Sequence, residues 1–279
     1  MLNIGNYNKL EISRITASGA VFKTEIGDVL LPLRLVPKGA EAGVLLEVFV
    51  YVDSEERLTA TTKRSRAVVG EFALLKVIES TTVGAFLDWG LEKDLLLPFG
   101  EQLEPVRRGN QVLVRIYLHT SGRIAASARL DKFISPVDDS LAEGDEVALL
   151  VYAHTDLGTK VIINDLFGGL IFHTELVVKP SCGERLRGYV KKIREDGKVD
   201  VTLRQGGAQE AEKDRRIILE ALAAHNGFLL LNDKSSPEAI ATLLRLSKKS
   251  FKKALGGLYK EGAVTMLPDG IRLRSNLKA

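Results

Sequence analysis

The chain repeats one pattern three times and then changes to another. Each copy contains a glycine, a strand of alternating apolar residues, a short polar turn, and a basic residue that opens a second strand. The glycines are Gly43, Gly109 and Gly183, and the basic residues are Arg57, Arg123 and Lys198. Repeats of this length are whole small domains, because the units of a solenoid span only about 20–50 residues. The function must therefore come from what a small five-stranded unit offers in tandem.

Composition is that of an ordinary globular protein. The 279 residues are 45% hydrophobic and 27% charged, which fits two to four small domains. Cys182 is the only cysteine, so a disulfide framework and a thiolate metal site are excluded. No apolar run approaches the ~18–20 residues that cross a bilayer, and the first residues lack the pattern of a signal peptide. We expect a cytoplasmic protein without a membrane partner.

The last quarter of the chain has a different period. Apolar residues recur every three or four positions, which indicates helices. The pattern and its capping residues predict a helix from Glu212 to His225, a strand from Phe228 to Leu231, helices that begin at Ser236-Pro237 and Ser247, and a hairpin about Pro268-Asp-Gly270. This is the element order of a winged-helix domain.

Four domains follow from these patterns. We predict a mainly β chain, with three tandem five-stranded barrels over 1–64, 67–130 and 144–205, followed by an α+β winged-helix domain over 211–279. The glycine-rich segment 205–209 is predicted to be a flexible hinge before the last domain.

Strand alternation sorts side chains between the inside and the outside of each barrel. In the second repeat the inner set comprises Val83, Ala85, Leu87, Val112, Val114, Ile116 and Leu118. The outer set includes Phe86 on one strand and Leu113, Arg115 and Tyr117 on another. Rings and guanidinium groups on an outer face suit unpaired bases, which stack on both.

Counting from the repeat glycine assigns the same outer positions in the other copies. The third copy has Arg187, Tyr189 and Lys191 there, and Lys160 takes the position of Phe86. The first copy has Glu47, Phe49 and Tyr51, with Val21 in the position of Phe86. Two interpretations stay open: these side chains bind nucleic acid, or they cover the sheet and pack against a neighbouring domain.

The helix that begins after Ser247 carries a basic arc. At about 100° per residue, the lysines fall within about 140°, and the apolar side chains lie opposite. The basic set is Lys248, Lys249, Lys252, Lys253 and Lys260, and the opposite set is Phe251, Leu255, Leu258 and Tyr259. No acid interrupts the arc before Glu261, whereas a merely soluble face mixes both signs. We predict contacts with nucleic-acid phosphates, and the alternative is an ordinary solvated face.

Catalytic chemistry has little support in the sequence. The phosphate-binding, dinucleotide-binding, zinc-protease and serine-hydrolase motifs do not occur. The histidines at positions 119, 154, 173 and 225 have no metal-ligand spacing. Glu92 with Asp94, or Asp138 with Asp139, could pair as the carboxylates of a metal-dependent nuclease, but acids in loops are usually only solvated. We expect no catalytic residue, no metal and no cofactor.

The copies resemble the OB-fold repeat of ribosomal protein S1, whose Gly-Ala-Phe motif recurs as Gly84-Ala85-Phe86. Three such repeats followed by a winged helix resemble the conserved virulence factor B family of bacteria, over nearly the whole chain. The resemblance implies OB-fold barrels, RNA binding and an influence on the expression of other genes. S1 repeats often carry a histidine after the third strand, and here that place is assigned to Leu31, Leu97 and Phe172.

These observations predict a non-catalytic protein that binds single-stranded RNA with low sequence specificity and regulates gene expression after transcription. The winged helix is a candidate for duplex nucleic acid, and the alternative function is a DNA-binding transcription regulator. The predicted binding residues are Phe86, Arg115, Tyr117, Lys160, Arg187, Tyr189, Lys191, Lys249, Lys252 and Lys253.

Overall fold

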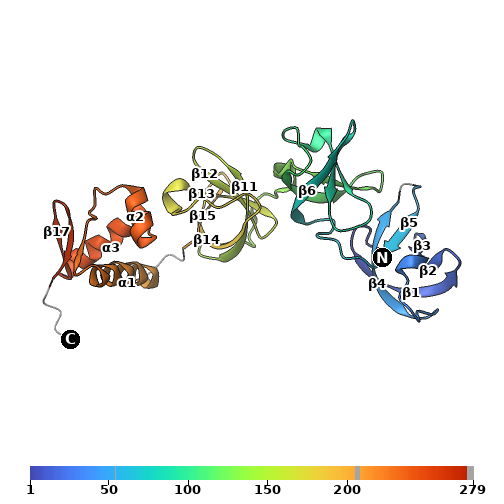
Figure 1. Cartoon of the computed structure of the whole chain (residues 1–279), viewed down its shortest axis with the longest axis horizontal. Helices are drawn as coiled ribbons and strands as arrows, with labels where there is room; N and C mark the ends of the chain where they lie inside the picture. Colours follow the sequence, from blue (N-terminus) through green and yellow to red (C-terminus); the bar gives the residue numbers. More distant parts are fainter. Residues whose placement is uncertain (54, 205–207, 275–279) are drawn as a thin grey trace. The chain divides into compact units, whose positions relative to one another are not determined.

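The computed structural model describes residues 1–53, 55–204 and 208–274. The chain forms two compact units, Met1–Phe133 and Ile134–Ala279, whose elements are labelled in Figure 1. Most of the predicted hinge, residues 205–207, lies outside the described residues. Within them, no helix is both long and apolar enough to span a membrane.

The first unit contains two five-stranded barrels. The first barrel is closed in the order β1-β2-β3-β5-β4, with strands β1 (Tyr7–Thr16), β2 (Gly19–Thr24), β3 (Gly27–Pro32), β4 (Leu45–Val52) and β5 (Leu58–Thr61). The second has the order β10-β9-β6-β7-β8, with strands β6 (Phe72–Ser80), β7 (Gly84–Asp88), β8 (Leu95–Pro98), β9 (Gln111–Leu118) and β10 (Ile124–Ser127). Short 3-10 helices η1 (Leu33–Leu35), η2 (Phe99–Glu101) and η3 (Leu130–Phe133) follow β3, β8 and β10.

The second unit contains the third barrel and the winged helix. The barrel is closed in the order β11-β12-β13-β15-β14, with strands β11 (Glu146–His154), β12 (Gly158–Ile163), β13 (Phe167–Phe172), β14 (Arg185–Ile193) and β15 (Val199–Thr202), and the 3-10 helix η4 (His173–Glu175) after β13. The mainly β fold class, with three barrels before an α+β domain, is confirmed. The four boundaries predicted for the domains stay predictions.

One glycine position explains why the pattern repeats. Gly84 pairs with Pro98 across β7 and β8, and a Cβ atom added to it would lie 2.4 Å from the carbonyl oxygen of Leu97. No side chain fits at that distance, so only glycine allows the two strands to pair this closely. The partners of the equivalent glycines are Pro32 in the first barrel and Phe172 in the third. The three places assigned to that histidine are therefore not equivalent, since Phe172 corresponds to Pro32 and Pro98 and not to Leu31 and Leu97.

The winged helix has the predicted element order. It comprises α1 (Ala208–Ala224), β16 (Phe228–Leu229), α2 (Pro237–Leu244), α3 (Lys248–Lys260), β17 (Val264–Leu267) and β18 (Gly270–Leu273). Ser236 caps α2 by accepting a hydrogen bond from the backbone N–H of Ala239 at 3.2 Å, and Ser247 caps α3 in the same way. The first helix begins four residues before the predicted start at Glu212.

The first two barrels pack together through an aromatic ring. Phe49 was expected on the outer face of the first barrel, yet its side chain is fully buried. Its ring lies edge-on to Trp89 of the second barrel, with centroids 5.5 Å apart, and is also edge-on to Tyr7 at 5.4 Å. At this position the alternative interpretation is the right one, because the ring packs against a neighbouring domain.

Candidate nucleic-acid interface

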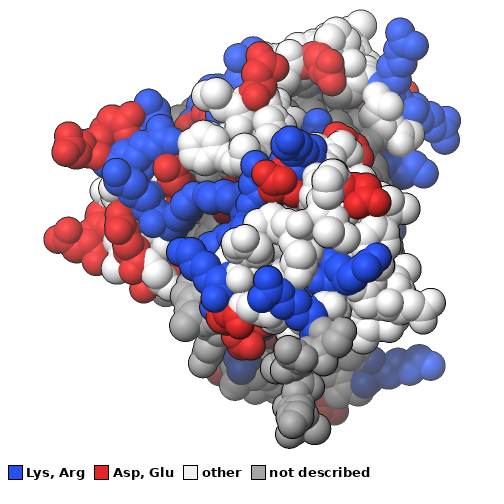
Figure 2. Space-filling model, turned by 90° about the vertical axis from the view of Figure 1, so that its left-hand side faces the viewer, with Lys and Arg blue, Asp and Glu red and all other residues white. Residues whose placement is uncertain are grey.

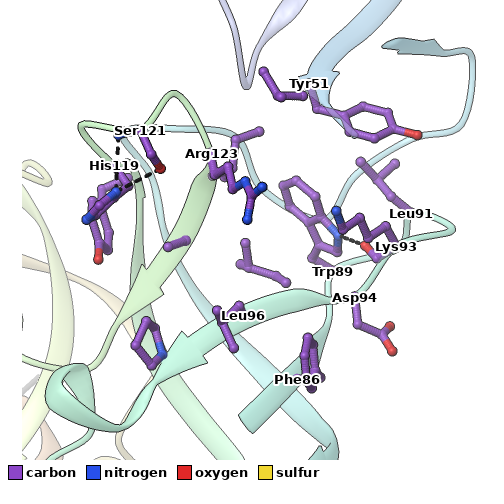
Figure 3. A pocket seen from close by; sticks show the side chains of 16 residues that line it. Tyr51, Phe86, Trp89, Leu91, Lys93, Asp94, Leu96, His119, Ser121 and Arg123 are labelled. Atoms are coloured by element: carbon purple, nitrogen blue, oxygen red, sulfur yellow. Dashed lines mark hydrogen bonds between the residues drawn. The ribbon is translucent and has the colours of Figure 1, made fainter. Parts of the chain in front are cut away.

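A cavity of about 360 Å³ lies on the outer face of the second barrel (Figure 3). Strands β7, β8, β9 and β10 and their loops provide most of its wall, and Tyr51 with Val52 of the first barrel complete it. Phe86 and Tyr117, which the sequence assigned to this face, both line the cavity. The cross-strand neighbour of Phe86 is Leu96, and that of Tyr117 is Ala125. The cavity is therefore the part of the barrel where predicted ring positions meet.

Four aromatic side chains surround this cavity: Tyr51, Phe86, Trp89 and Tyr117. The indole of Trp89 is held in place, because its Nε1–H donates to the carbonyl oxygen of Lys93 at 2.5 Å. Burial, together with the nearby carboxylates Glu92 and Asp53, raises the pKa of Tyr51. Burial and Glu101 likewise raise the pKa of Tyr117. Both phenols therefore stay neutral at physiological pH and can donate hydrogen bonds.

Charged groups of both signs stand around these rings. Arg123 and Lys93 are the cations, and His119 holds its ring against Ser121, with 2.9 Å between Nδ1 and Oγ. Asp94 is an acid in the wall, and burial, with the charges of Asp88 and Glu79, raises its pKa. The cavity thus offers rings and a few polar groups, and its two cations, Arg123 and Lys93, outnumber the one carboxylate, Asp94, in its wall.

Arg115 lies outside this cavity, although it shares the outer face. Its guanidinium lies over the ring of Phe72 at 4.4 Å and within 5.9 Å of the ring of Phe133. Phe133 also contacts Tyr117, with ring centroids 5.9 Å apart. The alternation predicted the correct face for Arg115, but it gave no sign of Phe133, which follows the barrel and covers part of that face. Leu118, predicted inside, is 42% exposed at the end of its strand.

In the third barrel, Lys160 has the strand position of Phe86. It pairs with Leu170 as Phe86 pairs with Leu96, and its ammonium nitrogen lies 5.4 Å from the centre of the Tyr152 ring. Arg187 is exposed and forms an ion pair with Glu146 at 3.4 Å. Tyr189 is half-buried on the same strand. Lys160 thus lies on β12, and Arg187 and Tyr189 lie on β14 of the same barrel.

A β-bulge changes one assignment in β14. The pairing with β15 shifts between Val190 and Lys192, so that Lys192 lies opposite Asp200. That is the position that Tyr117 takes opposite Ala125 in the second barrel. A bulge adds one residue to a strand, and counting from a glycine cannot detect it. The prediction that Lys191 takes the position of Tyr117 is therefore wrong, since Lys192 takes it.

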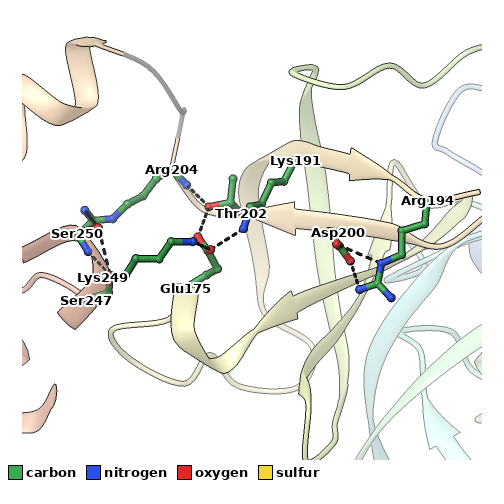
Figure 4. Close-up of polar contacts among 9 residues, drawn as sticks. All are labelled: Glu175, Lys191, Arg194, Asp200, Thr202, Arg204, Ser247, Lys249 and Ser250. Atoms are coloured by element: carbon green, nitrogen blue, oxygen red, sulfur yellow. Dashed lines mark hydrogen bonds and ion pairs between the residues drawn. The ribbon is translucent and has the colours of Figure 1, made fainter. Parts of the chain in front are cut away.

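Lys191 instead meets a lysine of the winged helix at one carboxylate (Figure 4). The Nζ atoms of Lys191 and Lys249 lie 2.7 and 3.0 Å from Oε1 of Glu175. The hydroxyl of Thr202 donates to the other carboxylate oxygen at 3.3 Å. Burial opposes ionisation of Glu175, but the hydrogen bonds and charges of the two lysines outweigh it and lower the pKa of the carboxyl group. The sequence analysis did not single out Glu175, because its partners are distant along the chain.

The rest of the basic arc on α3 is exposed at Lys252 and Lys253, while Lys248 is half-buried. Tyr259 was expected on the apolar side, but it is 50% exposed, and Ala254 joins the buried row instead. Figure 2 faces the winged-helix side and shows Lys and Arg side chains gathered there, with acids among them.

Charge is unevenly divided along the chain. Residues 211–279 contain thirteen Lys and Arg against seven Asp and Glu. The barrel segments are balanced, with eight of each sign in 1–64, seven in 67–130 and nine in 144–205. The winged helix therefore carries the positive charge of the protein. In the described part of the chain, no three His, Cys, Asp or Glu side chains are grouped as metal ligands would be.

Comparisons with known proteins agree with this domain order. The model described as S1 domain matches residues 4–63 and 69–129, and the model described as CvfB-like winged helix domain matches residues 216–273. The Bacillus subtilis protein YitL is 32% identical over 228 residues, which cover 78% of this chain and 76% of that protein. Conserved virulence factor B of Staphylococcus epidermidis is 26% identical over 235 residues, which cover 81% and 78%.

A crystal structure from Streptococcus pneumoniae TIGR4 is also similar. It is described as a multidomain protein with nucleic acid binding domains, and it aligns with 97% of this chain and 98% of its own at 25% identity and a TM-score of 0.41.

Proposed function

The chain belongs to the conserved virulence factor B family, and on this premise we propose that it is a non-catalytic protein that binds single-stranded RNA with low sequence specificity. Its S1 and winged-helix domains are of kinds that bind nucleic acids.

The cavity on the second barrel is the observation that carries the proposal. The half-buried rings of Tyr51, Phe86 and Tyr117 offer flat apolar surface to bases that are not paired, and stacking of this kind accepts every base. Trp89 is 4% exposed and belongs to the core behind the cavity wall. The neutral phenols of Tyr51 and Tyr117 add hydrogen-bond donors that do not repel phosphates. A duplex keeps its bases stacked inside, so a cavity of this kind favours a single strand.

The winged helix supplies the second element of the proposal. Its excess of six positive charges, with Lys252 and Lys253 exposed on α3, attracts phosphates of any sequence. Lysine contacts of this kind position a strand without selecting bases. Low sequence specificity therefore follows from both surfaces, because neither rings nor ammonium groups distinguish one base from another.

The wider role that we propose is regulation of gene expression after transcription, in the cytoplasm where transcripts are translated and degraded. Two observations support this role: the aromatic cavity and the exposed lysines suit RNA, and the chain belongs to the conserved virulence factor B family. Measured half-lives of transcripts, compared between cells with and without the protein, test it. Unchanged half-lives and unchanged translation for every transcript would contradict it.

A DNA-binding transcription regulator is the second candidate function. The exposed lysines of α3 favour it, since α3 is the helix that a winged-helix domain commonly inserts into a major groove. The position of Lys249 argues against it, because the ammonium group of this lysine forms an ion pair with Glu175 of the third barrel.

Competition binding distinguishes the two functions. A labelled single-stranded RNA is bound by the purified protein and displaced by unlabelled single-stranded RNA or by duplex DNA of the same length. We expect RNA to displace the label at much lower concentration, and equal or tighter binding of duplex DNA would contradict the proposal. Incubation of the same RNA with protein and magnesium should leave it intact, whereas cleavage would make the protein a nuclease.

A further inference from the structure

An arginine in the wall of the second-barrel cavity is paired with an acid of the first barrel. Arg123 lines the cavity just before β10 and is labelled in Figure 3. Its Nη2 atom lies 3.0 Å from Oε1 of Glu56, in the loop between β4 and β5. Tyr51 and Val52 of the first barrel also line this cavity. The first barrel therefore contributes a wall and a charge to a site on the second.

The backbone beneath Glu56 is held in an unusual conformation. Its φ is 62°, in the left-handed region that few residues other than glycine adopt. Asp53 supports the loop, because its Oδ1 atom accepts hydrogen bonds from the backbone N–H groups of Glu55 and Arg57 at 2.8 and 3.0 Å. Strain of this kind persists only where the surrounding structure imposes it. The loop therefore fixes the place from which Glu56 reaches Arg123.

Other contacts hold the first barrel against this cavity. Glu92, in the loop before β8, forms ion pairs with Arg34 of the first barrel and, at 2.9 Å, with Lys63 just after β5. The edge-on contact between Phe49 and Trp89 adds buried apolar surface to the same junction. The ion pairs cross the junction in both directions, since the second barrel provides an acid in one set and a base in the other. Both barrels belong to one compact unit, so the loop of the first barrel stays beside the cavity.

The pairing of charges favours a base over a phosphate as the ligand of Arg123. A phosphate that approaches the guanidinium also approaches the carboxylate of Glu56, and the two anions repel each other. A base is uncharged, so the carboxylate does not exclude it. The guanidinium carries five N–H donors in a planar fork, and its bond to Glu56 is made at Nη2. Arg123 can therefore donate to the edge of a base while Glu56 holds it.

Guanine has the edge that fits this fork. Its O6 and N7 atoms are neighbouring acceptors, and their bidentate contact with arginine is the commonest specific contact to a base. Adenine has an amino group in place of O6, which would set a donor against a donor. Asp94, in the same wall, can accept hydrogen bonds from the N1–H and the N2 amino group of guanine. Phe86 and Tyr117 provide rings on which the base stacks.

We propose that the cavity selects a guanosine within single-stranded RNA, with Arg123 donating to O6 and N7 and Glu56 of the first barrel as the positioning residue. The inference rests on the proposed function, and it names the one base that such a strand presents to this site. Overall sequence specificity stays low, because one position of the strand is selected and the rest is held by stacking and charge. The first barrel thus acts through the site of its neighbour.

The first test measures the affinity of the full chain for a uridine-only RNA oligonucleotide and for the same oligonucleotide with one guanosine, adenosine or cytidine at its centre. We expect the guanosine to be bound about ten-fold more tightly than the adenosine, at the lower end of the discrimination that a bidentate arginine provides. Equal affinity for the four oligonucleotides would overturn the proposal and leave the proposed function standing. If none of them is bound, the proposed function itself fails.

Competition by guanosine monophosphate distinguishes a guanosine in a strand from a free nucleotide. The nucleotide should displace the labelled guanosine-containing RNA only at far higher concentration than the same RNA without a label does, because it lacks the other contacts of the strand. Displacement at similar concentrations would make the cavity a site for a free nucleotide and contradict the proposal.

Variants of the pair test whether Arg123 recognises the base. R123K keeps the positive charge and removes the fork, so the preference for guanosine should disappear. E56Q should weaken that preference and steepen the plot of log affinity against log salt by roughly one unit, because the uncompensated guanidinium then binds a phosphate. E55Q is the matched control, since Glu55 lies in the same loop but pairs with Arg57 of its own barrel at 2.6 Å.

The three replaced side chains are all more than half exposed, so thermal unfolding of each variant should match that of the unaltered protein. A guanosine preference that survives in R123K, or identical results for E56Q and E55Q, would overturn the proposal.

Discussion

The second barrel and the winged helix offer nucleic acid two different surfaces. The second barrel has equal numbers of acids and bases over 67–130, and its cavity is walled by rings. The winged helix has almost twice as many bases as acids over 211–279, and the lysines of α3 lie mainly on its exposed side. One surface suits bases and the other suits phosphates. If the protein binds RNA as proposed, its affinity should therefore have one part that resists salt and another that salt removes.

The largest expected effect tests whether the aromatic surface of the second barrel continues into the first barrel. Phe49 has a strand position equivalent to that of Arg115, but it is fully buried between the first two barrels. Phe49→Ala should lower the free energy of unfolding by about 3–5 kcal/mol, because a large buried ring is removed. Thermal or urea unfolding measures this change. A variant of normal stability that binds RNA poorly would extend the base-binding surface into the first barrel.

Phe86→Ala is the next largest change. Removal of this half-buried ring from the cavity should weaken RNA binding by about 1–3 kcal/mol, the usual contribution of one stacked base. Stability should change little. Phe99 is a suitable control, because it is 50% exposed on the same barrel and does not line the cavity. Equal losses of affinity for Phe86→Ala and Phe99→Ala would show that the cavity has no special role, and unfolding of Phe86→Ala would place the ring in the core.

The sequence predicted the strand side of several residues in the second barrel, because the period of two is local, although Leu118 at the end of its strand is exposed. Phe86, Arg115 and Tyr117 are on one outer face as the alternation requires. Local patterns also predicted the caps of α2 and α3, since Ser236 and Ser247 act on residues only three positions away.

What covers an outer face could not be predicted in the same way. Phe49 is buried by Trp89, which lies 40 positions later, and Lys249 meets Glu175 across 74 positions. The bulge at Lys191 has no local signal either, since it adds a residue without changing the apolar pattern. Arg115 shows the same limit, because Phe133, whose ring lies within 5.9 Å of its guanidinium, follows the barrel outside the repeated pattern.

Replacement of lysines in the basic arc of α3 should have a smaller effect on RNA affinity, measured at low salt. The triple variant Lys249→Gln, Lys252→Gln and Lys253→Gln should weaken RNA binding, because up to three phosphate contacts are lost. Filter binding at low salt measures the loss. Lys9, Lys23 and Lys38 of the first barrel can be changed together as a control of equal charge. Equal weakening by both triple variants would show that only net charge matters, and not the place of the lysines.

The smallest expected effect concerns acid. The pKa of Glu175 is lower in the folded protein than in the unfolded chain, so its ionised form stabilises the fold. That contribution is complete above the unfolded pKa and is lost as pH falls through the lowered folded pKa. It amounts to no more than about 1 kcal/mol, because the lysines are exposed. As the pH is lowered from 7 to 3, the free energy of unfolding should therefore fall more steeply for the unaltered protein than for E175Q. Parallel curves would contradict this.

The most direct test of the two-surface account is a salt titration of RNA binding by three proteins side by side: the unaltered chain, Phe86→Ala and the triple lysine variant. The account predicts that Phe86→Ala shifts the plot of log affinity against log salt downward without changing its slope, since stacking releases no counterions. The triple variant should flatten the slope, by up to about three units if all three lysines contact phosphates. A change of slope in Phe86→Ala, or an unchanged slope in the triple variant, would contradict the division between bases held by the barrel and phosphates held by the winged helix.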